Sequence, residues 1–261
     1  MKMFASLITI MLIAFPSFAY EWKESKDIEH IFTNAGIKGT FVLYDASNNL
    51  FFGHNKERAQ TRFIPASTFK IPNTIIGLSI GAVTSVDEIL PYGGGKCFLP
   101  EWERDMGLRE AIAMSNVPIY QELARRIGLV NMKANIEKLN YGNNNIGKVI
   151  DTFWLSGPLK ISPIEQTIFL SKLAQTALPF PKTAQKAVSE ITLIESNDNW
   201  ELHAKTGLLL ESKPGIGWWV GWVVKNSQVY AFALNLEVRD FSDKDKRIPL
   251  GKSALQALRI I

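Results

Sequence analysis

Two residues three positions apart, Ser67 and Lys70, carry the groups that nucleophilic catalysis needs. They follow Pro65 and precede Ile71, which places them at the start of a predicted helix. Residues at this spacing share a helix face, so the amine would reach the hydroxyl. A serine at a helix start also lies at the positive end of the helix dipole, which stabilises an oxyanion at the neighbouring amide. Because S-x-x-K is common by chance, the pattern predicts a nucleophile only together with other motifs.

Two later motifs would complete such a site. Ser115-Asn116-Val117 lies at a loop-to-helix junction, where the serine would relay a proton or simply cap the helix. Lys205-Thr206-Gly207 leads into the C-terminal strands; its cation and hydroxyl suit a substrate carboxylate, although a plain surface turn is the alternative. In this order the three motifs match the nucleophile, hydroxyl relay and carboxylate-binding set of class A β-lactamases and penicillin-binding proteins.

Five ordered motifs make the chain resemble a class D, OXA-type serine β-lactamase over essentially the whole mature sequence. They are Pro65–Asn73 (P-A-S-T-F-K-I-P-N), Ser115-x-Val117, Tyr141-Gly142-Asn143, Phe153-Trp154-Leu155 and Lys205-Thr206-Gly207. The resemblance implies the α+β fold of serine β-lactamases and penicillin-binding transpeptidases, with an antiparallel sheet flanked by terminal helices plus a helical subdomain. It also implies hydrolysis of penicillin-type antibiotics without a metal or another cofactor.

Val117 indicates how the chemistry at Lys70 would differ from that of class A enzymes, which have an amide at the matching position. An apolar wall disfavours the ammonium ion and lowers the lysine pKa. A neutral amine can add CO2, and the resemblance implies that Lys70 becomes N6-carboxylysine, with CO2 or bicarbonate required. It further implies that the indole N–H of Trp154 donates to the carbamate, whereas the local sequence alone would make Trp154 a core residue.

The remaining roles are also implied by the resemblance. Carbamylated Lys70 would take the proton of Ser67, Ser115 would pass it to the lactam nitrogen, and the backbone amides of Ser67 and Leu208 would hold the oxyanion. The same base would then activate water to release the acyl-enzyme. The residues expected to bind substrate are Lys205, Thr206, Gly207, Leu208 and Tyr141, with Trp102, Met114 and Leu155 as candidate pocket walls.

One position departs from the family pattern. Relatives often carry an arginine after the last strand that anchors the substrate carboxylate, and Gly251 stands at the matching place. Arg247 or Lys252 would compensate, or Lys205 and Thr206 would bind the carboxylate alone. The sequence does not decide among these alternatives.

The N-terminus predicts secretion. Residues 4–15 are almost entirely apolar and Ser17-Phe18-Ala19 follows, which is typical of a signal peptide over residues 1–19 cleaved near Ala19; a buried helix is the alternative. The mature protein is expected to be periplasmic or secreted, with no membrane segment. Its single Cys97 cannot form an intramolecular disulfide, and the sequence leaves open a monomer or a homodimer.

Composition predicts a packed globular domain with enough apolar residues for a sizeable core, because 46% of residues are hydrophobic and 21% charged. The net charge of +4 is scattered, which fits anionic small molecules and argues against a nucleic-acid partner. We expect a single catalytic domain over residues 20–261. Its α/β part would comprise approximately residues 20–66 and 200–261, with a helical part at approximately 67–199 and the active site between them.

Local patterns place the elements. Hairpins are predicted over residues 39–53 and 217–237, and terminal helices over 21–32 and 250–261. Ser162 and Glu165 form a capping box, and Asn116 leads a helix that ends at Gly128.

Three other functions compete with this interpretation. The first is an α/β-hydrolase, because the run from Gly77 to Gly81 matches the G-x-S-x-G nucleophile elbow around Ser79, and Asp198 and His203 follow in the order of that triad. That elbow needs a preceding strand, however, and a helix is expected there. A penicillin sensor would require transmembrane helices, and a transpeptidase is disfavoured by Val117 and Trp154. The three histidines lack metal-ligand spacing, so no metal is predicted.

Overall fold

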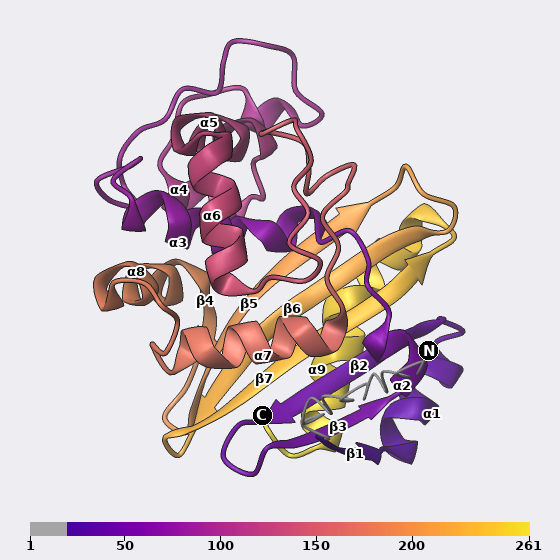
Figure 1. Ribbon diagram of the computed structural model, residues 1–261. Coiled ribbons are helices and arrows are strands. Elements are labelled where there is room, and N and C mark those ends of the chain that lie inside the picture. Colours follow the sequence, from indigo (N-terminus) through magenta and orange to yellow (C-terminus); the bar gives the residue numbers. More distant parts are fainter. Residues whose placement is uncertain (1–19) are drawn as a thin grey trace, which may run out of the picture.

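A seven-stranded sheet crosses the computed structural model, which describes residues 20–261 (Figure 1). Its strand order is β1-β3-β2-β7-β6-β5-β4, and the pairs are antiparallel except for β1 with β3. The strands are β1 (Glu21–Glu24), β2 (Gly39–Asp45), β3 (Leu50–His54), β4 (Leu193–Ser196), β5 (Trp200–Leu209), β6 (Gly215–Lys225) and β7 (Gln228–Val238). The predicted signal peptide lies outside the described residues.

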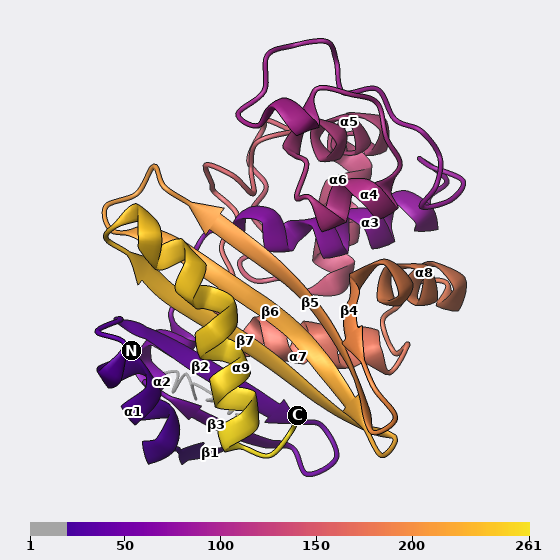
Figure 2. The same ribbon diagram turned by 180° about the vertical axis from the view of Figure 1, so that it is seen from behind.

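Helices cover both faces of this sheet. Figure 2 shows α1 and α9 on one face, and Figure 1 shows α7 across the other, with α3 to α6 gathered beside it. The helices are α1 (Lys26–Asn34), α2 (Lys56–Gln60), α3 (Lys70–Ser79), α4 (Leu108–Ala113), α5 (Val117–Ile127), α6 (Leu129–Leu139), α7 (Pro163–Ala174), α8 (Lys182–Thr192) and α9 (Arg247–Ala257). Short 3-10 turns are η1 (Ala66–Phe69), η2 (Pro100–Trp102) and η3 (Phe241–Lys246).

Most local predictions are confirmed. The two predicted hairpins are β2–β3 and β6–β7. The Ser162–Glu165 capping box opens α7, and the side chain of Asn116 caps α5, which ends before Gly128. The run from Gly77 to Gly81 forms the end of α3 and follows no strand, so it is not a nucleophile elbow.

Three boundaries differ from the predictions. Residues 21–24 form a strand, because the chain pairs in parallel with β3 there, and the first helix begins only after Ser25. The last helix begins at Arg247 instead of residue 250. Residues 67–199 were predicted to be helical, but they also contain the edge strand β4, which pairs with β5. Helix α7 in the same range lies across the sheet, because it buries apolar residues such as Phe169 against β6 and β7.

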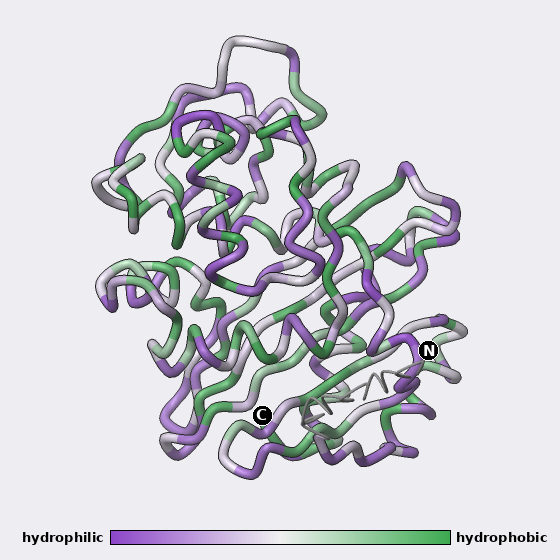
Figure 3. Tube along the Cα trace, in the orientation of Figure 1, coloured by the Kyte–Doolittle hydropathy of each residue, from purple (hydrophilic) through white to green (hydrophobic). Residues whose placement is uncertain are grey.

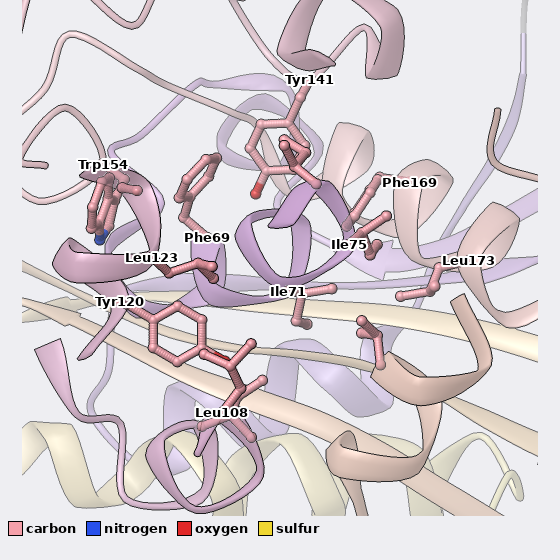
Figure 4. Packing of buried hydrophobic residues seen from close by; sticks show 14 of the residues in the cluster. Phe69, Ile71, Ile75, Leu108, Tyr120, Leu123, Tyr141, Trp154, Phe169 and Leu173 are labelled. Atoms are coloured by element: carbon pink, nitrogen blue, oxygen red, sulfur yellow. The ribbon is translucent and has the colours of Figure 1, made fainter. Parts of the chain in front are cut away.

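The core has a large cluster on each side of the sheet and a small third cluster that contains Val42 and Phe51. Figure 3 shows hydrophobic stretches along the central strands and hydrophilic residues at the turns that join them. The larger cluster unites α3, α5 and α7 with one sheet face, and Figure 4 shows Ile71 and Ile75 of α3 at its centre. The second joins α1 and α9 to the other face. The first cluster encloses the helix that begins at Lys70, so packing fixes the position of that residue.

Candidate active site

Ser67 and Lys70 face each other at the junction of η1 and α3. The Lys70 Nζ donates a hydrogen bond of 2.9 Å to the Ser67 Oγ. Ser67 lies in the 3-10 turn and Lys70 is the first residue of the α-helix, so the predicted amine–hydroxyl contact forms across the junction. Ala66, just before the nucleophile, has a φ of +48°, a conformation that costs a non-glycine residue of order 1–3 kcal/mol.

Buried polar contacts hold η1 in place. The Thr68 hydroxyl donates to the carbonyl of Pro65 at 2.8 Å and accepts from the Gln166 side chain of α7 at 2.9 Å. The indole N–H of Trp218 on β6 donates to the Ile64 carbonyl at 2.9 Å. These contacts join the turn that carries Ser67 to α7 and the sheet. Gln166 and Trp218 gave no signal in the sequence, because their partners lie far away along the chain.

Lys70 is fully buried. Its exposed fraction is 0%, and its Nζ lies 5.2 Å from the ring centroid of Tyr120, a residue of α5 one turn after Val117. Burial lowers the pKa of Lys70 well below its usual range, and the positive charge of Lys205 lowers it further. The sequence argument from Val117 predicted that the pKa of Lys70 would be lowered. It did not predict the contribution of Lys205 or the contact with Tyr120.

Ser115 and Lys205 form the second functional pair. Ser115, with a φ of +61°, immediately precedes the cap of α5, and the Lys205 Nζ of β5 donates to its Oγ at 3.0 Å. Burial, followed by the charge of Arg247, lowers the pKa of Lys205 to about 7. The pair therefore couples a hydroxyl to an amine that titrates near neutrality.

A cavity of about 690 Å³ opens in front of these residues. It is lined by Ser67, Ser115, Val117 and the predicted substrate-binding residues Thr206, Gly207, Leu208, Trp102, Met114 and Leu155. Lys70 and Lys205 are buried, and their amines contact the lining residues Ser67 and Ser115. The cavity also has an apolar rim at Phe98, Leu210 and Phe241 that sequence reasoning missed, since lone exposed apolar residues carry no periodic signal.

Gly207 brings β5 close to the nucleophile. A Cβ on Gly207 would lie 3.0 Å from the Pro65 carbonyl and 3.1 Å from the Thr68 methyl group. The strand can approach η1 this closely because the residue has no side chain. This contact places the chain around Leu208 beside Ser67, the two residues whose amides were predicted to hold the oxyanion.

Tyr141 does not line the cavity. The other residues predicted to bind substrate line it, except Lys205, whose amine contacts the lining residue Ser115. Tyr141 is 1% exposed, and its ring packs edge-on against Phe69 within the hydrophobic cluster (Figure 4). Its hydroxyl donates to the Gln166 side chain at 3.4 Å. The prediction that Tyr141 binds substrate is therefore corrected: a large aromatic ring here fills the core beneath η1.

Trp154 combines a core position with an unused donor. Its ring is fully buried and stacks on Phe69, the residue before Lys70, at a centroid distance of 5.4 Å. Among residues 20–261 its Nε1 has no hydrogen-bond partner. In the view of Figure 4 this nitrogen lies on the side of the ring toward Tyr120, whose ring also faces the Lys70 amine. A buried N–H without a partner is costly, so the site suits an acceptor that binds there.

Position 251 has no room for a side chain. A Cβ on Gly251 would lie 2.1 Å from the Trp219 ring. Of the two cations that the sequence offered as substitutes, Lys252 pairs with Glu195 on β4, whereas Arg247 lines the cavity. The structure thus separates two cations that the sequence left equivalent.

Comparison with known proteins agrees with this geometry. The family model for the penicillin-binding protein transpeptidase domain matches residues 39–256, which assigns the fold to that group. Beta-lactamase OXA-5 of Pseudomonas aeruginosa is 38% identical over 256 residues, covering 97% of this chain and 94% of the relative. Beta-lactamase OXA-48 of Klebsiella pneumoniae is 36% identical, covering 98% and 97%.

A solved structure gives the same result. FUS-1 (OXA-85), a class D β-lactamase from Fusobacterium nucleatum subsp. polymorphum, is 44% identical with a TM-score of 0.88, covering 92% of this chain and 100% of that one. The chain belongs to the class D, OXA-type β-lactamases and hydrolyses β-lactams (EC 3.5.2.6).

Proposed function

We propose that this β-lactamase acts through an acyl-enzyme on Ser67, with Lys70 as the general base in its carbamylated form. The observation that carries the proposal is the fully buried Lys70 amine, 2.9 Å from the Ser67 hydroxyl. An amine held neutral by burial adds CO2 and releases a proton, which leaves a carbamate anion on Nζ. The partnerless Nε1 of Trp154 would donate to that anion.

The residues divide the reaction into two steps. Lys70 accepts the Ser67 proton as Oγ bonds to the lactam carbonyl carbon, and the backbone amides of Ser67 and Leu208 stabilise the oxyanion. The carbon–nitrogen bond then breaks, and Ser115 passes to the nitrogen the proton that Lys70 took from Ser67, which leaves the Lys70 carbamate unprotonated again. In the second step Lys70 takes a proton from water, the water oxygen attacks the ester, and Ser67 leaves with its proton restored.

Nitrocefin hydrolysis with and without added bicarbonate tests the modified base. Activity should fall in CO2-depleted buffer and return on replenishment, whereas indifference to bicarbonate would reject carbamylation. Covalent labelling by a fluorescent penicillin should disappear in Ser67→Ala and persist in Ser79→Ala. A stable adduct without turnover would instead favour a penicillin sensor or a transpeptidase.

Secretion is the second part of the proposal. Its support is the sequence of residues 1–19, which lies outside the described part of the chain. Within residues 20–261, no helix is long and apolar enough to cross a membrane. Expression of the full chain in a bacterium should deliver a mature protein that begins near Tyr20 to the periplasm or medium; N-terminal sequencing of fractionated cells measures this. Monomer or homodimer stays a prediction, which gel filtration would decide.

A further inference from the structure

Arg247 reaches the active-site cavity from the first residue of α9. Its Nη1 donates to the Gly207 carbonyl at 2.7 Å, and its Nε donates to the carbonyl of Lys244. Arg247 lines the same cavity as Ser67 and Thr206. The guanidinium therefore lies at the end of the Lys205-Thr206-Gly207 motif.

Gly217 on β6 makes this path available. A Cβ built on Gly217 would lie 3.0 Å from Cδ and 3.2 Å from Cγ of Arg247. The alkyl stem thus crosses β6 at a position without a side chain and ends beside Gly207 on β5. These packed contacts fix the stem before any ligand arrives, which lowers the entropy cost of binding.

The charge of Arg247 is not neutralised by the protein. Among residues 20–261 no carboxylate lies within 4.0 Å of the guanidinium, and only two of its five N–H donors are engaged. Burial lowers the pKa of Arg247, while Asp245 raises it to a smaller extent. Neighbouring cations already have partners: Lys244 pairs with Asp245 and Lys252 with Glu195. A partly buried cation with free donors is stabilised by an anionic ligand.

We propose that Arg247 anchors the carboxylate of the β-lactam substrate, jointly with Lys205 and Thr206, in this chain where Gly251 leaves no room for a side chain. The inference deepens the proposed function and rests on it. The planar guanidinium presents parallel N–H donors that match the two oxygens of a carboxylate. Position 247 is one helical turn before 251 on α9, so the same helix supplies the cation from a different residue.

Binding is measured in the Ser67→Ala background, so that turnover does not enter. Calorimetry would compare benzylpenicillin with its methyl ester, which lacks the charge. Adding Arg247→Ala should weaken binding of the carboxylate about tenfold or more, and binding of the ester less than about twofold. Arg247→Lys should recover part of the affinity because it keeps the charge without the fork. Lys252→Ala, on the same helix, is the matched control and should leave both affinities unchanged.

The assignment would be overturned if Arg247→Ala weakened the binding of benzylpenicillin and of its methyl ester equally, or left the affinity for benzylpenicillin unchanged. Failure of the Ser67→Ala parent to bind benzylpenicillin would also overturn it. Thermal unfolding of each variant checks that the fold is intact. Because the readout needs neither Ser67 nor CO2, a failed bicarbonate test would reject the modified base and leave this result standing. In the enzyme with Ser67 present, Arg247→Ala should raise KM for nitrocefin more than it changes kcat.

Discussion

The Lys205 amine of the sheet donates to the Ser115 hydroxyl of the helical region at 3.0 Å. This bond joins the two parts of the chain at the wall of the cavity that Ser67 also lines. In the proposed mechanism Lys205 would therefore have two tasks, since the same amine would hold the proton relay and contribute positive charge for a substrate carboxylate. Both tasks depend on its protonation state.

The substrate affinity should therefore depend on pH near neutrality. With a pKa of about 7, Lys205 is mainly a cation below pH 7 and mainly a neutral amine above it, whereas the substrate carboxylate stays anionic throughout. The KM for nitrocefin should rise as the pH increases through about 7. Lys205→Arg keeps its charge in this range, so its KM should be flat with pH even if kcat is lower. The same alkaline rise in that variant would contradict the assignment.

Trp154→Phe tests the donor proposed for the carbamate. The substitution retains an aromatic ring in the core but removes the N–H that has no partner among residues 20–261. The bicarbonate concentration that gives half-maximal activity should increase about tenfold or more, because a hydrogen bond to a charged group contributes about 1.5–3 kcal/mol. Trp222→Phe is a control for general loss of packing, since Trp222 is also buried but stacks on His203. If the bicarbonate concentration for half-maximal activity increased equally in Trp154→Phe and Trp222→Phe, the increase would come from lost packing and not from the lost N–H donor.

Val117→Asn tests whether the apolar wall keeps Lys70 neutral. An amide at this position would give the ammonium form a polar partner and raise the lysine pKa, so less carbamate would form at a given pH. The activity without added bicarbonate should fall, and saturating bicarbonate should restore part of it. The acid limb of the kcat profile should move to higher pH. Val117→Ile keeps the wall apolar and should leave that limb in place.

The sequence predicted which polar side chains meet at the cavity better than it predicted the residues packed around them. Short motifs with fixed spacing predicted that Ser67, Lys70, Ser115 and Lys205 would lie together, as they do in the structure. Hairpins and helix caps were predicted because they depend on local residues. Gln166 and the packing role of Tyr141 were missed, since they depend on contacts between distant segments. Arg247 and Lys252 are equivalent in the sequence and differ only in their tertiary contacts, because Lys252 pairs with Glu195 whereas Arg247 lines the cavity.

Gly251→Ala should destabilise the protein even though alanine favours helices. The new Cβ would lie 2.1 Å from the Trp219 ring, so α9 must move away from the sheet face that it covers. Overpacking of this kind costs about 1–3 kcal/mol, against about 1 kcal/mol gained in helix propensity. The net loss is then up to about 2 kcal/mol, which would lower Tm by several degrees in a domain of this size. Ser253→Ala, at an exposed position of the same helix, should keep or slightly raise Tm. Because Arg247 begins α9, Gly251→Ala should also raise KM for nitrocefin. A lowered Tm with an unchanged KM would show that the position of Arg247 does not depend on the packing beneath Gly251.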